Sequence, residues 1–243
     1  MSSIIVTILA AGEGKRMRSE IPKVLHLFCG KPMLVWIIET ARTLCPEKII
    51  IVTGRHHKQI IKTLAKWMDS FGIVFVEQPE PIGTGNAVMC CLDHYITESK
   101  VLILNGDMPL ITASLLDSFI RYYANTDCVV LTAILSNPHG YGRILYENGS
   151  FAGIIEEKDC TEEQRKIHEI NSGIYLISGN VLQTFLPKIT NDNAQGEYYL
   201  TDIVKWIRTS SSHFCSTYLI DESENFCIRG INTPEELLEL SNF

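Results

Sequence analysis

The fold is decided by Leu9-Ala-Ala-Gly-Glu-Gly-Lys-Arg-Met17, a loop that directly follows the apolar run Ile4–Leu9. A continuous run rich in β-branched residues is typical of a strand buried on both faces of a sheet. The small residues after it let backbone N–H groups approach an anion closely. A strand that ends in such a loop is typical of α/β sheets, which bind ligands at the carboxyl ends of their strands.

The same loop begins a cluster of positive charge in an acidic chain. Lys15, Arg16, Arg18, Lys23 and Lys31 fall within 17 residues, although the net charge is −7. A triphosphate needs both features, because amides give close contact and cations give charge. A Gly-rich turn with solvated charges is the alternative. The loop lacks the G-K-[ST] ending of a Walker loop and the third glycine of the dinucleotide fingerprint.

Strand and helix patterns alternate in the first half of the chain. This alternation predicts a mixed, mainly parallel α/β sheet with helices on both faces. After residue 128 fewer helices lie between the predicted strands. We expect this half to add antiparallel strands to the same sheet and a lid over the site, with a hairpin at Asn148-Gly149. The predicted strands are 4–9, 48–52, 73–76, 101–104, 128–135, 143–146, 151–156 and 173–177, and the predicted helices are 34–44, 57–68, 85–95, 115–123, 199–208 and 234–240.

Length, composition and charge exclude several classes of protein. The 243 residues fit one large α/β domain, 1–243, and two small domains are the alternative. An acidic chain is unsuited to nucleic acid, and no apolar run reaches the roughly 20 residues of a membrane span. The eight cysteines form no C-x-x-C pair, so we read them as reduced thiols of a cytoplasmic protein.

Polar residues that end strands or begin helices are candidates for ligand contacts. Asp107, in Asn105-Gly106-Asp107, ends an apolar strand, and Mg²⁺ prefers one or two carboxylates plus substrate phosphates. Gln78 and Gly83-Thr84 flank a helix start, where free N–H groups can meet a base or phosphate. The alternatives are a plain turn at Asp107 and a simple helix entry with Thr84 as the cap.

Carboxylates and amides also recur in the second half, where they suit a sugar. Gly142, Glu156 and Asn171 lie among predicted turns and strand ends. Taken alone, each is more often a turn or surface residue than a ligand contact.

Taken together, these motifs resemble the sugar-phosphate nucleotidyltransferases. The motifs fall in order along the chain: Leu9-Ala-Ala-Gly-x-Gly-x-Arg-Met17 with Pro22-Lys23, Glu77-Gln78, Gly83-Thr84-Gly85, Gly106-Asp107, Gly140-Tyr-Gly-Arg-Ile144, Glu156-x-Lys158-Asp159, Glu169-Ile-Asn-x-Gly173, Asn193-Ala-Gln-Gly-Glu-Tyr-Tyr-Leu-Thr-Asp202 and Gly230-x-Asn232. The later ones resemble the uridylyltransferase half of the bacterial bifunctional enzymes that make UDP-N-acetylglucosamine. The likeness covers nearly the whole chain and implies a three-layer, Rossmann-like nucleotide-diphospho-sugar transferase fold.

The resemblance also implies substrates, a cofactor and residue roles. UTP and N-acetylglucosamine 1-phosphate would give UDP-N-acetylglucosamine and pyrophosphate, with Mg²⁺ as cofactor. Arg16 and Lys23 are the implied catalytic residues, Asp107 and Asn232 the implied metal ligands. Within one domain, residues 1–127 are the implied nucleotide-binding half and residues 128–243 the implied sugar-binding half. The implied sugar contacts are Gly142, Glu156 and Asn171. The implied nucleotide contacts are Leu9, Ala10, Ala11, Gly12, Gln78, Gly83, Thr84, Asn105 and Gly106.

The chain departs from the family's pattern at three places. Asn105 stands where the family often has Tyr, and Arg229 stands where an acidic residue is usual. The chain also stops at Phe243, so we expect it to lack the acetyltransferase activity of the bifunctional enzymes. Two other functions stay open: a related nucleotidyltransferase for dTTP, CTP or another sugar phosphate, and a non-catalytic subunit that binds nucleotide sugars.

Overall fold

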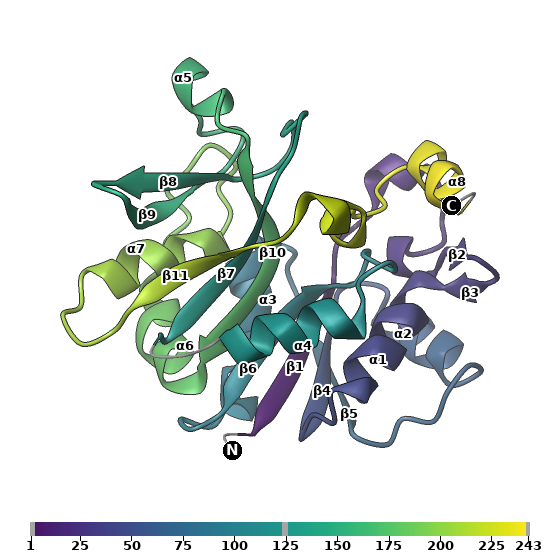
Figure 1. The fold of residues 1–243 in the computed structure, drawn as a ribbon. Coiled ribbons are helices and arrows are strands. Elements are labelled where there is room, and N and C mark those ends of the chain that lie inside the picture. Colours follow the sequence, from purple (N-terminus) through teal and green to yellow (C-terminus); the bar gives the residue numbers. More distant parts are fainter. Residues whose placement is uncertain (1–2, 123–125, 242–243) are drawn as a thin grey trace.

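One large sheet forms the centre of the molecule. The computed structural model describes residues 3–122 and 126–241. Within them the sheet has nine strands: β1 (Ile4–Ala10), β4 (Lys48–Thr53), β5 (Ile73–Glu77), β6 (Lys100–Asn105), β7 (Cys128–Ile134), β8 (Arg143–Glu147), β9 (Ser150–Ile155), β10 (Glu169–Ser178) and β11 (Cys215–Leu219). Their order is β11-β7-β10-β6-β1-β4-β5, and the β8–β9 hairpin joins at β10 (Figure 1).

Strand directions follow from the connections. Strands β4, β1 and β6 are parallel, and β10 lies antiparallel between β6 and β7. Because α4 (Ala113–Tyr122) connects β6 to β7 as a crossover, β7 keeps the direction of β6, and β11 is parallel to β7. The expected antiparallel additions are confirmed, because β7 and β8 each pair antiparallel with β10, and β9 pairs antiparallel with β8. Strand β11, which is parallel to β7, was not among the predicted strands. The hairpin is confirmed, with positive φ at Asn148 and Gly149.

Helices cover both faces of the sheet, as predicted. On one face, Val6 and Ile8 of β1 share a core with α1 (Met33–Thr43), α2 (His57–Leu64) and α4. On the other, Ile5 shares a second core with α3 (Thr84–Met89), α6 (Gly179–Phe185) and α7 (Ile203–Arg208). Successive strand residues point to opposite faces, so a strand buried on both must be apolar throughout.

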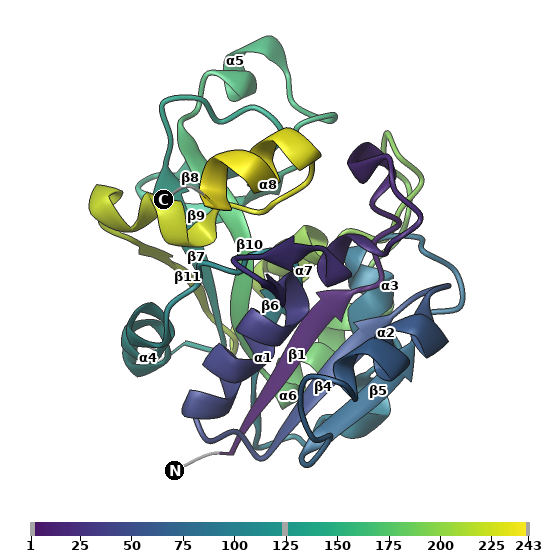
Figure 2. The same ribbon diagram turned by 90° about the vertical axis from the view of Figure 1, so that its right-hand side faces the viewer.

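A smaller cluster ties the C-terminal segment to the N-terminal third of the chain. Strands β2 (Leu27–Phe28) and β3 (Lys31–Pro32) form a separate two-stranded sheet, which Figure 1 labels near α8 (Pro234–Ser241). In Figure 2 the yellow helix α8 lies next to the purple, N-terminal part of the ribbon. Phe28 and Met33 pack there with Ile231 and Leu240, all four of them buried. This contact carries the segment before α8 to the edge of the sheet where β1 and β6 end.

Several predicted elements differ in extent from the observed ones. The predicted helix 57–68 ends at Leu64, and 85–95 divides into α3 and the 3₁₀ turn η3 (Leu92–His94). Residues 199–208 begin as the 3₁₀ turn η5 (Leu200–Asp202). The end of the helix predicted at 115–123 falls on Tyr123, outside the described residues.

Strand β11 and helix α6 were not predicted. The side chains of β11 are mostly half-buried, so its sequence lacks a clear apolar pattern. Helix α6 begins at a glycine, which is a weak helix former. It is stabilised by its cap, because Ser178 accepts a hydrogen bond from Val181 N at 3.3 Å.

Among the described helices, none is long and apolar enough to cross a membrane. The remaining short elements are α5 (Glu162–Arg165), η1 (Lys15–Met17), η2 (Lys23–Leu25), η4 (Leu186–Lys188) and η6 (Glu222–Ile228).

Candidate active site

The ends of β1 and β6 bring together the Gly-rich loop that begins at Leu9 and the turn Asn105-Gly106-Asp107. Leu9 pairs with Asn105 in parallel register, and Gly106 N donates to Leu9 O at 2.8 Å. A Cβ at Gly106 would lie 2.9 Å from Leu9 O, so only glycine allows this approach of the two backbones. Asp107 is thereby held beside the loop that follows Leu9.

Two cavities meet at this edge of the sheet. One has a volume of about 550 Å³ and is lined by the loop after β1 and the turn before α3. The other, of about 990 Å³, is lined by the second half of the chain. Both volumes are of the size that small-molecule ligands occupy in proteins. Leu9, Thr84, Asn105 and Asp107 line both cavities, so they mark the junction.

The structure places nearly all of the predicted site residues on these walls. The smaller cavity is lined by Leu9, Ala10, Ala11, Gly12, Lys23, Gln78, Gly83, Thr84, Asn105 and Asp107. The larger adds Arg16, Gly142, Glu156, Asn171 and Asn232. Gly106 lines neither and acts through its backbone hydrogen bond. These positions come from segments far apart in sequence, so their meeting depends on the fold.

The loop after β1 places Arg16 and Lys23 where the two cavities join. Gly14 has φ +63°, and a Cβ there would lie 2.7 Å from the Cβ of Lys23, so this glycine lets the loop fold over Lys23. Lys15 also lines the smaller cavity, but its charge is paired with Glu13 at 2.5 Å. Lys31 lines neither cavity and instead pairs with Glu39 at 2.5 Å.

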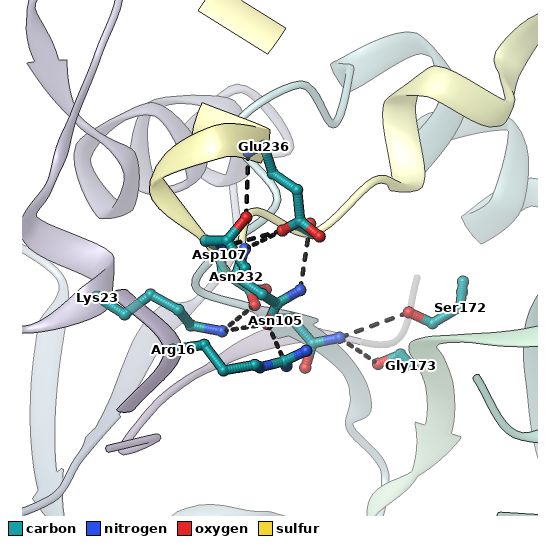
Figure 3. Close-up of polar contacts among 10 residues, drawn as sticks. Arg16, Lys23, Asn105, Asp107, Ser172, Gly173, Asn232 and Glu236 are labelled. Atoms are coloured by element: carbon teal, nitrogen blue, oxygen red, sulfur yellow. Dashed lines mark hydrogen bonds and ion pairs between the residues drawn. The ribbon is translucent and has the colours of Figure 1, made fainter. Parts of the chain in front are cut away.

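Four charged and polar groups meet where the cavities join (Figure 3). Lys23 donates to the Asp107 carboxylate, and its Nζ lies 3.0 Å from Asn232 Oδ1. Arg16 donates to the same Asn232 oxygen at 2.9 Å. Side chains from the first loop, the end of β6 and the segment before α8 thus form one cluster. Two oxygen ligands converge on a single cationic nitrogen.

Glu236, in the first turn of α8, completes this cluster and was missed by the sequence reasoning. Its Oε2 accepts hydrogen bonds from Asn232 N at 2.6 Å and Thr233 N at 3.1 Å. A signal was available, because Thr233-Pro-Glu-Glu236 has the spacing of a capping box. The spacing predicts a helix start but does not show which neighbouring residue the carboxylate also holds.

The turn before α3 is fixed by the backbone of a distant segment. Gly85 N donates to Tyr198 O at 2.7 Å, and Leu200 N donates to Thr84 Oγ1 at 3.1 Å. Thr84 therefore does not cap α3, contrary to the simple reading of the sequence. Gln78 is 3% exposed and donates to Gly83 O at 3.1 Å, so its amide shapes the same turn.

The larger cavity contains a carboxylate and an amide with well-defined partners. Glu156 accepts from Thr201 Oγ1 at 3.1 Å, and burial raises its pKa above the ordinary value. Asn171 donates to Tyr175 Oη at 2.7 Å and accepts from Gly173 N at 2.9 Å. Its orientation is therefore fixed before any ligand arrives.

The structure shows what Asn105 and Arg229, the two residues that depart from the family pattern, contact. Asn105 Nδ2 lies 3.5 Å from the carbonyl oxygens of both Ser172 and Gly173, a long contact at the junction of the cavities. Arg229 donates to Glu239 at 2.8 Å, so its charge is paired with α8. Arg229 also lines the larger cavity.

Comparison with known proteins gives consistent matches along the chain. Residues 6–170 match the family model described as the MobA-like NTP transferase domain. A probable UDP-N-acetylglucosamine pyrophosphorylase of Acanthamoeba polyphaga mimivirus is 41% identical over 96% of this chain and 93% of its own length. The bifunctional protein GlmU of Francisella philomiragia is 45% identical over 98% of this chain. The chain spans about half the length of that bacterial relative, 51%.

Solved structures share the fold at lower identity. HddC from Yersinia pseudotuberculosis, complexed with GMP-PN, superposes with a TM-score of 0.71 at 20% identity and covers 98% of both chains. A putative glucose-1-phosphate thymidylyltransferase from Bacillus anthracis, in complex with a sucrose, gives 0.73 at 19% identity over 99% of this chain and 94% of that chain. The predicted α/β fold is confirmed.

Proposed function

This chain belongs to the MobA-like NTP transferase family, and from that membership we propose that it is a UDP-N-acetylglucosamine pyrophosphorylase. It joins UTP to N-acetylglucosamine 1-phosphate and releases pyrophosphate. The mimivirus relative, by its name, supports this choice of substrates. Nucleic acid and membranes are not among the proposed partners.

The observation that carries the proposal is the junction of the two cavities at Asp107. A transfer between two bound molecules requires two binding spaces that share the reacting position. The smaller cavity, with its backbone amides and Lys23, suits a nucleotide. The larger, with Glu156 and Asn171, suits a sugar. We assign the first mainly to residues 1–127 and the second mainly to 128–243, within one domain.

The chemistry needs positioning and charge neutralisation rather than a covalent intermediate. An oxygen of the sugar phosphate attacks the α-phosphorus of UTP in line. The bond from that phosphorus to its bridging oxygen breaks, and pyrophosphate leaves with the electron pair. Arg16 and Lys23 lie at the junction, where they meet the negative charge of the phosphates. Holding both substrates there converts a bimolecular step into one within a single complex.

The residues at the junction fit a magnesium ion. Asp107 and Asn232 offer oxygen ligands that converge on one position, since Lys23 Nζ contacts both side chains. Among the described residues no cluster of three His, Cys, Asp or Glu side chains could hold a metal alone. Magnesium is commonly bound by one or two carboxylates together with substrate phosphates. Bound there, it would offset phosphate charge at the reacting centre.

Recognition of the sugar rests on Glu156 and Asn171. A carboxylate accepts hydrogen bonds from sugar hydroxyls, and an amide both donates and accepts, which suits an acetamido group. A site built to bond a polar group rejects an analogue without it, because its own buried groups are left unpaired. We therefore expect N-acetylglucosamine 1-phosphate to exceed glucose 1-phosphate in kcat/KM by at least about tenfold, or ~1.4 kcal/mol.

Pyrophosphate release from UTP, dTTP and CTP, each with several sugar 1-phosphates, tests the proposal. UTP with N-acetylglucosamine 1-phosphate should be the best pair. Asp107→Asn is the matched control and should reduce turnover by orders of magnitude with an unchanged circular dichroism spectrum. Another best pair would keep the transferase and change its substrates. Binding of UDP-N-acetylglucosamine without any pyrophosphate release would leave only a binding subunit.

A further inference from the structure

Glu236 makes more contacts than a helix cap requires. Its backbone N donates to Thr233 Oγ1 at 3.1 Å while its carboxylate accepts from Thr233 N at 3.1 Å. These two reciprocal bonds complete a capping box at the start of α8. The shorter bond, 2.6 Å, goes one residue further back, to Asn232 N. The carboxylate therefore holds a residue that the cap itself does not involve.

Asn232 is held along its backbone and contacted at its side chain. The preceding N–H, of Ile231, donates to the carbonyl oxygen of Asp107 at 2.9 Å. Two consecutive backbone N–H groups are thus fixed, one to Asp107 and one to Glu236. The side-chain oxygen of Asn232 then lies within reach of Arg16 and Lys23 (Figure 3).

Helix α8 is itself packed against the rest of the molecule, so the Glu236 carboxylate that accepts from Asn232 N is kept in a fixed position. Ile231 and Leu240, on either side of Glu236 in the sequence, are 0% and 2% exposed and pack with Phe28. Arg229 and Glu239 join the two ends of the segment through their 2.8 Å ion pair.

We propose that Glu236 is a positioning residue, which fixes Asn232 so that its side-chain oxygen and the Asp107 carboxylate can bind one divalent cation together. This inference rests on the proposed function, because it assigns Asn232 to the metal. It adds a residue that does not itself touch the cation. A fixed ligand loses little conformational freedom on binding, so the preorganised pair binds the cation more tightly.

The test measures thermodynamic coupling between Mg²⁺ and UTP rather than turnover. The Kd of UTP is measured by isothermal titration calorimetry with excess Mg²⁺ and again with EDTA, without sugar phosphate. The ratio of the two values is the gain that the metal supplies. Glu236→Ala should reduce this ratio by about tenfold or more while the EDTA value changes little. Glu236→Gln keeps an oxygen that accepts from Asn232 N, so it should restore most of the ratio.

Two further variants separate positioning from helix stability. Thr233→Ala removes the other half of the capping box but leaves the bond between Glu236 and Asn232. It should lower Tm about as much as Glu236→Ala yet keep a nearly normal ratio. Glu235→Ala removes an exposed carboxylate from the same turn and should change neither quantity.

Two results would overturn the inference. One is a normal ratio in Glu236→Ala. The other is an equal loss of the ratio in Thr233→Ala, which would make Glu236 only a helix cap. A wild-type protein that binds UTP with no gain from Mg²⁺ would remove the proposed metal site as well, so the two failures are distinguishable.

Discussion

Glu156 is a carboxylate that the fold keeps largely out of water. Burial raises its pKa above the ordinary 4.5, and the nearby carboxylates of Asp202 and Asp159 raise it further. The hydrogen bond from Thr201 opposes this shift only in part. A group held in an unfavourable environment in the free protein is commonly one that a ligand uses.

Glu156→Gln should therefore stabilise the protein and impair sugar binding. Because the folded pKa is raised, the folded state binds the proton more tightly than the unfolded chain. The free energy of unfolding of the wild type consequently falls as pH rises from about 4.5 through the folded pKa of Glu156. A glutamine at this position does not ionise, so the variant does not lose this stability. Tm at neutral pH should rise in the variant. The KM for N-acetylglucosamine 1-phosphate should increase about tenfold or more, since hydrogen bonds to charged groups contribute roughly 1.5–3 kcal/mol.

The measurement is differential scanning calorimetry of both proteins from pH 4 to 8, together with steady-state kinetics. The difference in Tm should widen with pH and then level off. A Tm difference independent of pH would show that ionisation of Glu156 has no part in stability. An unchanged KM would remove Glu156 from the sugar site.

Among elements, the turn before α3 shows how closely one segment can rest on another. Gly83 has φ +111° and ψ 166°, a conformation that is almost exclusive to glycine. A Cβ at this position would lie 2.8 Å from Tyr198 N and 2.9 Å from Tyr198 C. The wall of the smaller cavity therefore depends on the absence of one side chain.

Gly83→Ala should destabilise the protein by about 2–4 kcal/mol, because backbone strain and a clash with main-chain atoms add. Gly149→Ala is the matched control, since Gly149 has φ +75° but nothing within 4 Å of its Cβ position. It should cost only about 1–2 kcal/mol. Urea unfolding followed by circular dichroism measures both. Equal losses would mean that the turn moves aside at no cost.

The same turn shows what the sequence could and could not predict. The buried strands and the Gly-rich loop were predictable because apolar periodicity and small residues are local signals. Thr84 was predicted as a site residue and lines both cavities, but its partner, Leu200 N, lies 116 residues away in sequence. Strand β11 and the tie between Glu236 and Asn232 depend on tertiary contacts. A local pattern carries no information about either.

At the scale of the whole molecule, β10 joins the two halves of the chain. It pairs with β6 from the first half and with β7 from the second. Both large cores also contain residues of both halves, such as Val6 with Ile170 in one and Ile5 with Val204 in the other. Neither half has a closed core of its own.

The chain should therefore unfold in one cooperative transition. Trp36 reports on the first half through its hydrogen bond to Phe28 O at 2.8 Å, and Trp206 lies on α7 in the second half. Two variants, each keeping one of these tryptophans and replacing the other two with Phe, allow separate urea curves by fluorescence. Coincident midpoints are expected, as in a two-state transition. Separate midpoints would divide the chain into two domains.

The segment before α8 contacts the loop after β1, although the two are at opposite ends of the sequence, and this has a consequence for biosynthesis. Lys23 leaves the ribosome 209 residues ahead of Asn232, its partner in the site. Most of the sheet can form on the emerging chain before the segment that carries Asn232 and α8 is released. A nascent chain that stops short of this segment would have the residues that line the smaller cavity, yet it would lack Asn232 and Glu236 of the larger one, and with Asn232 the oxygen that joins Arg16 and Lys23. Under the proposed function, competence for transfer would therefore arise only late in translation.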